Sequence, residues 1–581
     1  MLTWDTSFQR PADHFPNALL GEAAEASEPV QVLRRRRRLL MLVFLIALLP
    51  RAWSAWHWEI ICTDGVTYLE TADALQRGDF DTAFSYLGLN TYPVVLIWLK
   101  HSGLDRVWSG KWWSVAMATL AVLPLYGWVR RQFNDRMAVA ACILYAFHPM
   151  LIRDAPLLMR DATFWLLFNL TIYLLWRAMT EIRLWLFAAS GLVMTLAIHT
   201  RSEGWFLLVP AVLWAAFRWP AAAGRKTRLV VGTVACLAII PLSVLLVNVT
   251  LLREYPRWQL LRPNVRRDVK LLWNTVYEKL TPQRHTVANP AAPSRPAAQK
   301  KAASIPVDNR RPSNSKVTAE LAVWIAKSYS YFYGLLALLG VWKWRRVYFR
   351  PDNQALLAMA VSLCAAMWIR YQYCDRYLAP VVLVSFPWIA FGAFLVCDWL
   401  ARGPGRLLNW VPQKRLVLGC LLLAVIVAAG LYDAAPGPVP CARQKESLGL
   451  WALQHFGPNR KIICVNSDSR VARYYAQGPG YTTYVPPRYL MARLPHILNR
   501  QSPEVILVWK NIRHPQDPYA ALSVVRSNRK HGYERVSQEY LPEGCEDVVV
   551  MVRSDIAELC LPQGSCPIVA EKARAICSPR R

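Results

Sequence analysis

The stretch Arg34–Trp56, RRRRRLLMLVFLIALLPRAWSAW, sets a run of arginines directly before a long apolar segment. A helix that crosses a ~30 Å hydrocarbon core needs about 20 mostly apolar residues. Lys and Arg beside such a helix mark the side that stays in the cytoplasm. The stretch therefore predicts a membrane anchor that follows a polar cytoplasmic tail, residues 1–38. A cleaved signal peptide is the alternative, because small residues after an apolar run also fit that pattern; the length of the tail favours an uncleaved anchor.

The composition of the whole chain also indicates a membrane protein. Of the 581 residues, 54% are hydrophobic and 26 are Trp, which is more apolar surface than the cores of a soluble chain require. The formal charge of +30 fits nucleic acid, an anionic membrane surface or an anionic lipid substrate. The sequence contains no Gly-rich phosphate loop, paired-Cys zinc pattern or RNA-binding signature. We therefore expect the lipid bilayer and lipid substrates as partners, and no nucleic acid.

Apolar segments recur along most of the chain. Eleven of them are predicted membrane spans: 39–57, 111–130, 137–152, 161–178, 184–200, 204–218, 229–249, 320–342, 355–370, 377–399 and 415–432. With this count the short basic loops all fall on the cytoplasmic side. The basic loop 250–319 falls outside, but loops longer than about 60 residues follow the charge rule poorly. The predicted fold class is a mainly α, multi-pass protein of the plasma (inner) membrane, with a transmembrane domain over 39–432.

Two segments between the spans have patterns of their own. In the first outer loop, 58–110, the apolar positions from Val66 to Leu75 predict an amphipathic helix that lies on the membrane, and residues 90–103 predict a second interfacial helix. Residues 281–316 lack an apolar period and are rich in Pro, Ala and Ser, which predicts a flexible outer insertion.

From residue 433 onward the composition becomes that of a soluble domain. Short β-type runs alternate with helical stretches, which predicts a small extracytoplasmic α/β domain over 433–581. The β-type runs are 461–466, 504–509, 533–540 and 547–553. Six of the 13 Cys lie in this domain. Disulfides, which an exported domain allows, and free buried thiols are both open alternatives.

Several loops that this topology places on the outer face carry polar or ionisable residues close to the hydrocarbon. They are Asp64; Arg153, Asp154, Arg160 and Asp161; His199, Arg201 and Glu203; Cys374, Asp375, Arg376 and Tyr377. A charge at mid-membrane costs roughly 2.5–3.5 kcal/mol, so such groups usually face a cavity or one another. The set predicts a polar site at the outer membrane boundary. Structural explanations stand beside this one: a helix N-cap for Asp154, an interfacial ion pair for Arg201 with Glu203, and a snorkelling anchor for Arg376.

Three of these stretches, in this order along the chain, resemble a known family. They are the first outer loop, with Asp64 followed by a helix of the pattern Y-L-x-x-A-x-x-L-x-x-G-D; HPMLIRDAPLLMRDATFWLLFNL; and DRYLAPVVLVSFPWIA. Together they resemble family 39 of the GT-C glycosyltransferases, which includes protein O-mannosyltransferases and is similar to the bacterial lipid A aminoarabinose transferases. The resemblance covers about residues 39–432, and a soluble outer tail is also usual in bacterial members.

The resemblance implies a membrane enzyme of cell-envelope glycosylation. Such an enzyme transfers a hexose such as mannose, or a pentose, from a polyprenyl-phosphate donor to a protein or lipid acceptor outside the membrane. The reaction needs a base for the acceptor hydroxyl and positive charge for the departing phosphate. Asp64 is the candidate base, and a single carboxylate suffices for a displacement that inverts the anomeric carbon.

Other residues take further roles in this interpretation. Asp161 and Asp154 are additional catalytic candidates, and Arg376, Arg201 and Arg160 are candidate phosphate ligands because Arg offers a fork of donors. His199, Glu203 and Tyr92 are the remaining candidate substrate contacts. A divalent metal ion is a further open expectation, with Asp64 and His199 as its candidate ligands.

The chain departs from the family pattern in two places. Gly65 stands where many relatives carry a second acid, so that function is absent or has moved, with Glu70 and Asp161 as the candidates. Tyr92 and Pro93 are present without the Lys that relatives carry nearby. Two other classes of function compete with the transferase: a lipid or solute transporter or flippase, and a membrane-anchored scaffold. The clustering of charge at one boundary and the lack of an internal repeat disfavour the transporter.

Overall fold

The computed structural model describes residues 30–57, 61–222, 224–250, 314–343, 351–370, 374–402, 414–435, 440–465 and, with gaps, 470–555. Its contacts divide the chain into two units. The first holds the residues up to His57 and Asp79–Ala435, and the second holds Trp58–Gly78 and the residues from Pro436 onward. The segment Trp58–Gly78, from the first predicted outer loop, thus groups with the C-terminal domain.

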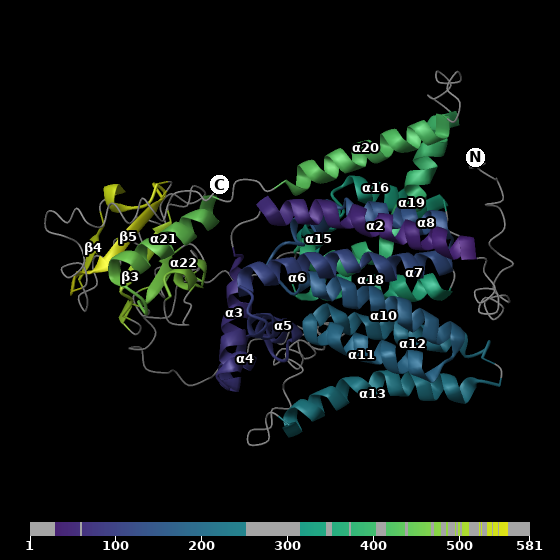
Figure 1. The fold of residues 1–581 in the computed structure, drawn as a ribbon, viewed down its shortest axis with the longest axis horizontal. Helices are drawn as coiled ribbons and strands as arrows, with labels where there is room; N and C mark the ends of the chain where they lie inside the picture. Colours follow the sequence, from purple (N-terminus) through teal and green to yellow (C-terminus); the bar gives the residue numbers. More distant parts are fainter. Residues whose placement is uncertain are drawn as a thin grey trace, which may run out of the picture. The chain divides into compact units, whose positions relative to one another are not determined.

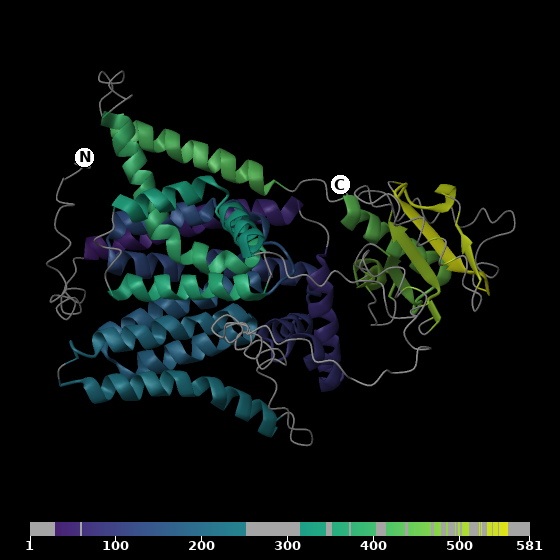
Figure 2. The ribbon, with the colours of Figure 1, turned by 180° about the vertical axis from the view of Figure 1, so that it is seen from behind.

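The described part of the first unit is helical (Figures 1 and 2). Its helices are α2 (Val30–His57), α4 (Phe80–Leu87), α5 (Thr91–His101), α6 (Arg106–Leu120), α7 (Val122–Gln132), α8 (Asp135–Ala146), α9 (Pro149–Arg153), α10 (Asp161–Glu181), α11 (Leu184–Thr200), η4 (Ser202–Leu207), α12 (Leu208–Arg218), α13 (Lys226–Thr250), α15 (Asn314–Ser328), α16 (Phe332–Lys343), α18 (Pro351–Arg370), η7 (Asp375–Leu378), α19 (Ala379–Arg402) and α20 (Lys414–Ala434). Helices coincide with each predicted span. In the described residues, six helical segments are long and apolar enough to cross a membrane, with α6 and α7 counted as one segment and η7 and α19 as another. The prediction of a multi-pass, mainly α membrane protein is confirmed.

Large apolar side chains fill the spaces between these helices. α10, α11 and α13 lie side by side in both views (Figures 1 and 2). Trp165 on α10, Phe187 on α11 and Trp214 on α12 are each at most 1% exposed. α13 instead leaves Leu242 and Leu246 largely exposed, as expected for a helix face that meets lipid tails.

Glycines allow one pair of helices to approach closely. A Cβ atom at Gly340 on α16 would collide with the carbonyl oxygen of Trp388, and one at Gly392 on α19 would collide with that of Leu336. Small residues at such a crossing let helix backbones pack closely in a membrane, where dispersion contacts rather than water drive association. This contact fixes α19, and with it the loop that precedes α19.

Polar side chains begin the helices of the first loop. Asp79 accepts a hydrogen bond from the backbone N of Thr82 at the start of α4, and Asn90 accepts one from the backbone N of Tyr92 at the start of α5. These are N-cap contacts, which satisfy backbone donors that a helix leaves open. The sequence pattern predicted two helices between Trp58 and Gly103, and the structure has a third, α4, which begins after its N-cap Asp79.

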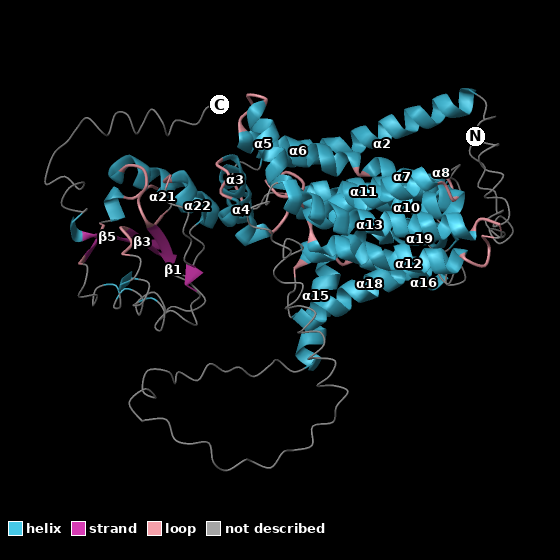
Figure 3. Ribbon diagram, turned by 90° about the horizontal axis from the view of Figure 1, so that it is seen from below, coloured by secondary structure: helices cyan, strands magenta, loops and turns pink. Residues whose placement is uncertain are grey.

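The second unit contains a five-stranded sheet (Figure 3). Its strands are β1 (Ile462–Val465), β2 (Tyr484–Val485), β3 (Val505–Trp509), β4 (Tyr533–Arg535) and β5 (Val548–Arg553), and its helices are α3 (Thr63–Gln76), α21 (Pro440–Phe456) and α22 (Arg470–Tyr475). The strand order is β2-β1-β3-β5-β4; β1 is parallel to β2 and β3, and β5 is antiparallel to β3 and β4. The predicted α/β character is confirmed, and three of the predicted β-type runs, 461–466, 504–509 and 547–553, coincide with strands. The fourth, 533–540, is only partly right: β4 takes Tyr533–Arg535, and the 3-10 helix η10 takes Gln538–Tyr540.

Some predictions fall partly outside the described residues. Most of the predicted insertion, 281–313, lies there, while 314–316 begin α15. Cys464 and Cys545 are buried free thiols. The side chains of the other C-terminal cysteines, Cys441, Cys560, Cys566 and Cys577, lie outside the described part, so disulfides among them stay a prediction.

Candidate active site

A network of arginines and acids surrounds the junction between α9 and α10 in the first unit. Nε of Arg153 donates to Oδ1 of Asp154 at 2.9 Å, and its Nη2 donates to Oδ2 of Asp375 at 2.6 Å. The second contact joins residues that are 222 positions apart in the sequence. The end of α9 and the start of η7, both predicted at the outer boundary, therefore meet in the folded chain.

Arg201 forms a second cluster, which shares the element η7 with the first, and the two clusters together are called the Arg201 network. It donates to Asp161 at the start of α10 through Nη1, and to both carboxylate oxygens of Glu203 through Nη2 (2.8 Å) and Nε (3.2 Å). The side chains of Arg201, Asp161 and Glu203 are 4%, 2% and 7% exposed. The guanidinium also lies over the Tyr377 ring, 5.4 Å from its centroid. Arg201 thus ties α10, η4 and η7 together.

Burial and charge act differently on two acids of the network. Burial raises the pKa of Asp154 to about 6, although Arg153 opposes the shift. Its Oδ2 has no hydrogen-bond partner among the described residues. Burial would also raise the pKa of Glu203, but the Arg201 and Arg160 guanidinium groups outweigh it and lower this pKa to about 2. The network therefore holds one firmly ionised acid and one acid that can take up a proton near neutral pH.

Two further arginines lie at the partly exposed edge of the network. Arg376 Nη1 lies 2.7 Å from Sδ of Met159, and the backbone N of Arg376 donates to Oδ1 of Asp375 at 2.9 Å. Arg160 contributes positive charge at Glu203. Both side chains are of intermediate exposure. Nε and Nη1 of Arg160 are nevertheless buried.

Two contacts at the start of α5 were not predictable from the sequence pattern. Nδ2 of Asn90 donates to the carbonyl oxygen of Thr200 at 3.4 Å, and Thr91 shares a 2.6 Å hydrogen bond with the Thr200 hydroxyl. The start of α5 is thereby held against the end of α11, next to Arg201. In the sequence, Asn90 matches the pattern of a helix N-cap. That pattern predicts where α5 begins, but it does not predict that this end of α5 contacts Thr200.

Arg51 is a second residue that sequence reasoning missed. It is 0% exposed, and it donates to the backbone oxygens of Ala47 (2.7 Å), Tyr145 (3.2 Å) and Ala146 (3.3 Å). Its guanidinium carbon also lies 4.6 Å from the centroid of the Tyr145 ring. Cations favour the carbonyl end of a helix, so Arg51 stabilises the end of α8, directly before α9.

Two predicted substrate contacts have polar partners elsewhere. His199 Nε2 forms a 2.9 Å hydrogen bond with the hydroxyl of Ser243 on α13. Tyr92 is 0% exposed, and its hydroxyl lies 3.4 Å from the oxygen of Gly110 and 3.3 Å from that of Ser114. The structure does not bring these two polar groups into the Arg201 network.

Asp64 belongs to the second unit. It lies in the first turn of α3, whose N-cap is Cys62, and its side chain is 40% exposed. Nη1 of Arg470 lies 3.9 Å from its Oδ1. A shared site of Asp64 with the Arg201 network remains a prediction. Within the described residues, no group of three or more His, Cys, Asp or Glu side chains is arranged to hold a metal ion.

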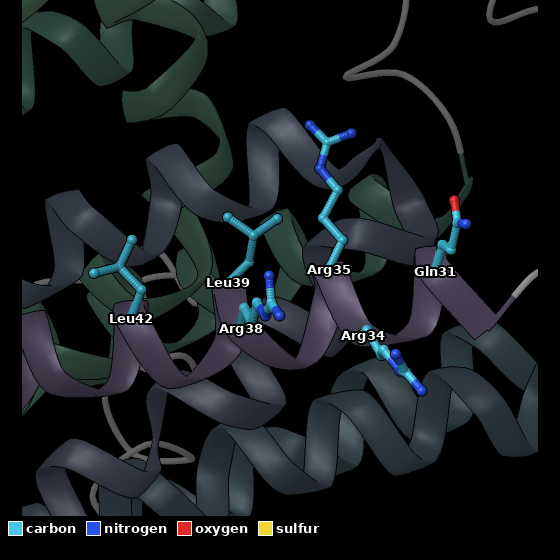
Figure 4. Close-up of a pocket in the computed structure, with 6 residues that line it drawn as sticks. All are labelled: Gln31, Arg34, Arg35, Arg38, Leu39 and Leu42. Carbon is cyan, nitrogen blue, oxygen red and sulfur yellow. The ribbon is translucent and has the colours of Figure 1, made fainter.

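A basic cavity lies at the N-terminal end of α2, far along this helix from Arg51. Its volume is about 380 Å³, and Gln31, Arg34, Arg35, Arg38, Leu39 and Leu42 line it. Figure 4 shows that all six residues come from the first turns of α2. The cavity is therefore not part of the Arg201 network.

Comparisons with known proteins agree with this architecture. The sequence model of the dolichyl-phosphate-mannose-protein mannosyltransferase family matches residues 96–246. A search of the curated proteins finds no significant match.

Two groups of solved structures are similar. ArnT from Cupriavidus metallidurans in the apo state is 15% identical, with a TM-score of 0.54 over 90% of this chain and 99% of that one. The same protein bound to undecaprenyl phosphate is 14% identical, with a TM-score of 0.52 over 92% and 100%. The oligosaccharyltransferase of Archaeoglobus fulgidus in the apo form is 13% identical, with a TM-score of 0.53 over 89% and 76%. The resemblance that the sequence predicted is confirmed: this chain has the fold of the GT-C glycosyltransferases.

Proposed function

We propose that this protein is a plasma-membrane glycosyltransferase that moves a sugar from a polyprenyl-phosphate donor to a protein or lipid acceptor outside the cytoplasm. The match to a mannosyltransferase family over 96–246 supports the reaction class. The similar ArnT structure contains undecaprenyl phosphate, and an Archaeoglobus fulgidus AglB structure with a TM-score of 0.51 contains a dolichol-phosphate. The observation that carries the proposal is the Arg201 network, which gathers guanidinium groups at one place in a chain of this fold.

Asp64 is the proposed general base. The acceptor hydroxyl oxygen attacks the anomeric carbon, the bond from that carbon to the phosphate oxygen breaks, and the carboxylate takes the hydroxyl proton. The sugar is joined to the acceptor with inverted configuration at its anomeric carbon, and the leaving group is released as a polyprenyl phosphate. The Asp64 side chain lies in the first turn of α3 and is 40% exposed, which supports its access to an acceptor.

The network supplies positive charge for the leaving phosphate. Arg376 and Arg160 are the proposed direct ligands, because both residues are less buried than Arg201. Arg201 is held by Asp161 and Glu203, so it contributes a fixed charge close to them. Arg153 joins α9 to η7 through Asp375, and Asp154 accepts a hydrogen bond from the same guanidinium.

Replacement of Asp64 by Asn tests the proposal. The variant keeps the size of the side chain and removes the base, so we expect turnover to fall by ~10²–10⁴ while the protein still inserts and folds. The assay measures release of free polyprenyl phosphate from polyprenyl-phosphate-linked sugars by the purified protein. Asp81→Asn, an exposed acid in the first turn of α4, is the matched control and should keep wild-type turnover.

Two results would contradict the proposal. Near wild-type turnover by Asp64→Asn would remove Asp64 from the role of base. Movement of the intact lipid-linked sugar across a vesicle membrane, with no release of polyprenyl phosphate, would identify a flippase instead.

A further inference from the structure

One side of α3 carries three polar residues, Asp64, Thr67 and Glu70, at steps of three residues. Residues three apart are neighbours on a helix surface, so these side chains form one polar strip. The opposite side of α3 is apolar and buried, with Val66 and Leu69 at most 1% exposed. The polar strip contains the proposed base, and what it contacts therefore bears on catalysis.

The strip is contacted by two arginines of the short helix α22, 403 positions further along the sequence. Arg473 forms an ion pair with Glu70, and Nη1 of Arg470 donates to the hydroxyl of Thr67 at 2.7 Å. The same Nη1 lies 3.9 Å from Oδ1 of Asp64. Both helices belong to the second unit, and they lie next to each other in Figures 1 and 3.

The two arginines differ in what they contribute. The side chain of Arg473 is 1% exposed, so its charge is withdrawn from water and depends on Glu70 for compensation. Arg470 is 28% exposed and reaches the first turn of α3, where Asp64 lies. Arg473 therefore fixes the middle of α3, and Arg470 fixes its beginning.

We infer that α22 of the C-terminal domain positions the proposed base: Arg473 with Glu70 holds α3 in place, and Arg470 with Thr67 orients the turn that presents the Asp64 carboxylate. The inference rests on the proposed function, in which Asp64 acts as the base. Arg470 and Arg473 are positioning residues that act through Asp64 and need not touch substrate. The C-terminal domain is then required for turnover rather than only attached to a complete enzyme.

Replacement of the two arginines in the full-length protein tests this inference without relying on activity alone. The first measurement is amide hydrogen exchange of peptides within 63–76, which we expect to rise in Arg473→Gln and in Arg470→Gln. Arg535→Gln is the matched control, because Arg535 is exposed on β4 of the same domain. It should leave the exchange of 63–76 unchanged.

The second measurement separates positioning from simple stabilisation. A misplaced base lowers kcat by about 10²-fold in both Gln variants. The KM for the polyprenyl-phosphate sugar should change little, because the arginines bind α3 and not the donor. Arg470→Lys, which keeps the charge, should restore part of kcat. The double variant of Glu70→Gln and Arg473→Gln should have a kcat only slightly below that of either single variant, because each single change already removes the same ion pair.

The outcomes distinguish this inference from the proposed function. Unchanged exchange of 63–76 in both Gln variants would overturn the contact between α22 and α3. Raised exchange with wild-type kcat would overturn the positioning role. A wild-type protein that releases no polyprenyl phosphate but shows the expected exchange would overturn the proposed function and leave the contact standing. If Arg473→Gln does not fold, the more exposed Arg470→Gln still gives both measurements.

Discussion

Arg201 donates hydrogen bonds to two carboxylates, Asp161 on α10 and Glu203 on η4, and all three side chains are at most 7% exposed. The two carboxylates fix the orientation of the guanidinium, because Asp161 binds its Nη1 and Glu203 binds its Nε and Nη2. This arrangement gives Asp161 a structural task beside the catalytic one that the sequence suggested. It also predicts a large stability effect when one acid is neutralised.

Asp161→Asn should destabilise the protein by about 3–5 kcal/mol, because the change leaves part of a buried charge without compensation. The control is Asp398→Asn on α19, whose partner Arg402 is 73% exposed. An exposed pair of this kind contributes at most about 1 kcal/mol. Thermal unfolding of both purified variants in detergent measures the difference. Equal unfolding temperatures for the two variants would contradict the structural role of Asp161.

Asp154 gives the protein a pH dependence near neutrality. Because burial raises its folded-state pKa to about 6, from an ordinary value of 3.8, the folded state holds this proton more tightly than the unfolded state. The contribution of Asp154 to stability is therefore fully present at low pH and is lost as the pH rises through about 6. Unfolding temperatures of the wild type and of Asp154→Asn, compared from about pH 4 to about pH 7, should differ in slope. Parallel curves would show that Asp154 does not titrate in this range.

The contribution of Glu203 to stability depends on pH in the opposite direction, and it changes at lower pH. Its folded-state pKa is lowered to about 2 from 4.5, so its contribution to stability is present above about 4.5 and is lost as the pH falls toward 2. Glu203→Gln should therefore be less stable than the wild type at neutral pH, and the two should converge in acid. The same unfolding series measures this, and a constant gap at all pH values would contradict it.

Arg376→Gln should lower kcat/KM for the polyprenyl-phosphate sugar by about 10²–10³, because the variant loses the guanidinium that we propose as a ligand of the leaving phosphate. Arg376→Lys should recover only part of the loss, since Lys keeps the charge but not the planar fork. Inhibition by free polyprenyl phosphate is the second readout and should weaken in parallel. The control is Arg402→Gln, because Arg402 is exposed and ends α19, the helix that follows η7. Unchanged inhibition of Arg376→Gln would show that Arg376 does not bind the phosphate.

Arg51→Ala should destabilise the protein by about 2–5 kcal/mol, because buried carbonyl groups at the end of α8 lose their donor and a cavity remains. Arg37→Ala, an exposed arginine of the same helix, is the control and should stay within about 0.5 kcal/mol of the wild type. Detergent unfolding measures both changes. A mild effect at Arg51 would mean that water replaces its hydrogen bonds.

The elements of the fold were predictable from the sequence because their signals are local. Apolar runs of membrane-spanning length predicted the helices, and short β-branched runs such as 547–553 predicted the strands. The two-residue strand β2 was missed because it is too short for a period, and α21 was not identified. The family motifs predicted the GT-C fold, since they mark the order of loops along the chain.

The sequence by itself determined which segments are helices and strands, which loops carry charge, and that Asp64 follows the first span. Only the tertiary structure decided the partners: Arg153 with Asp375, Arg201 with Asp161, Arg51 with the end of α8, and Arg473 with Glu70. An apolar period depends on neighbouring residues and can be recognised within one helix. The partner of a buried charge depends on which helix faces meet, and packing between segments up to 403 positions apart settles that.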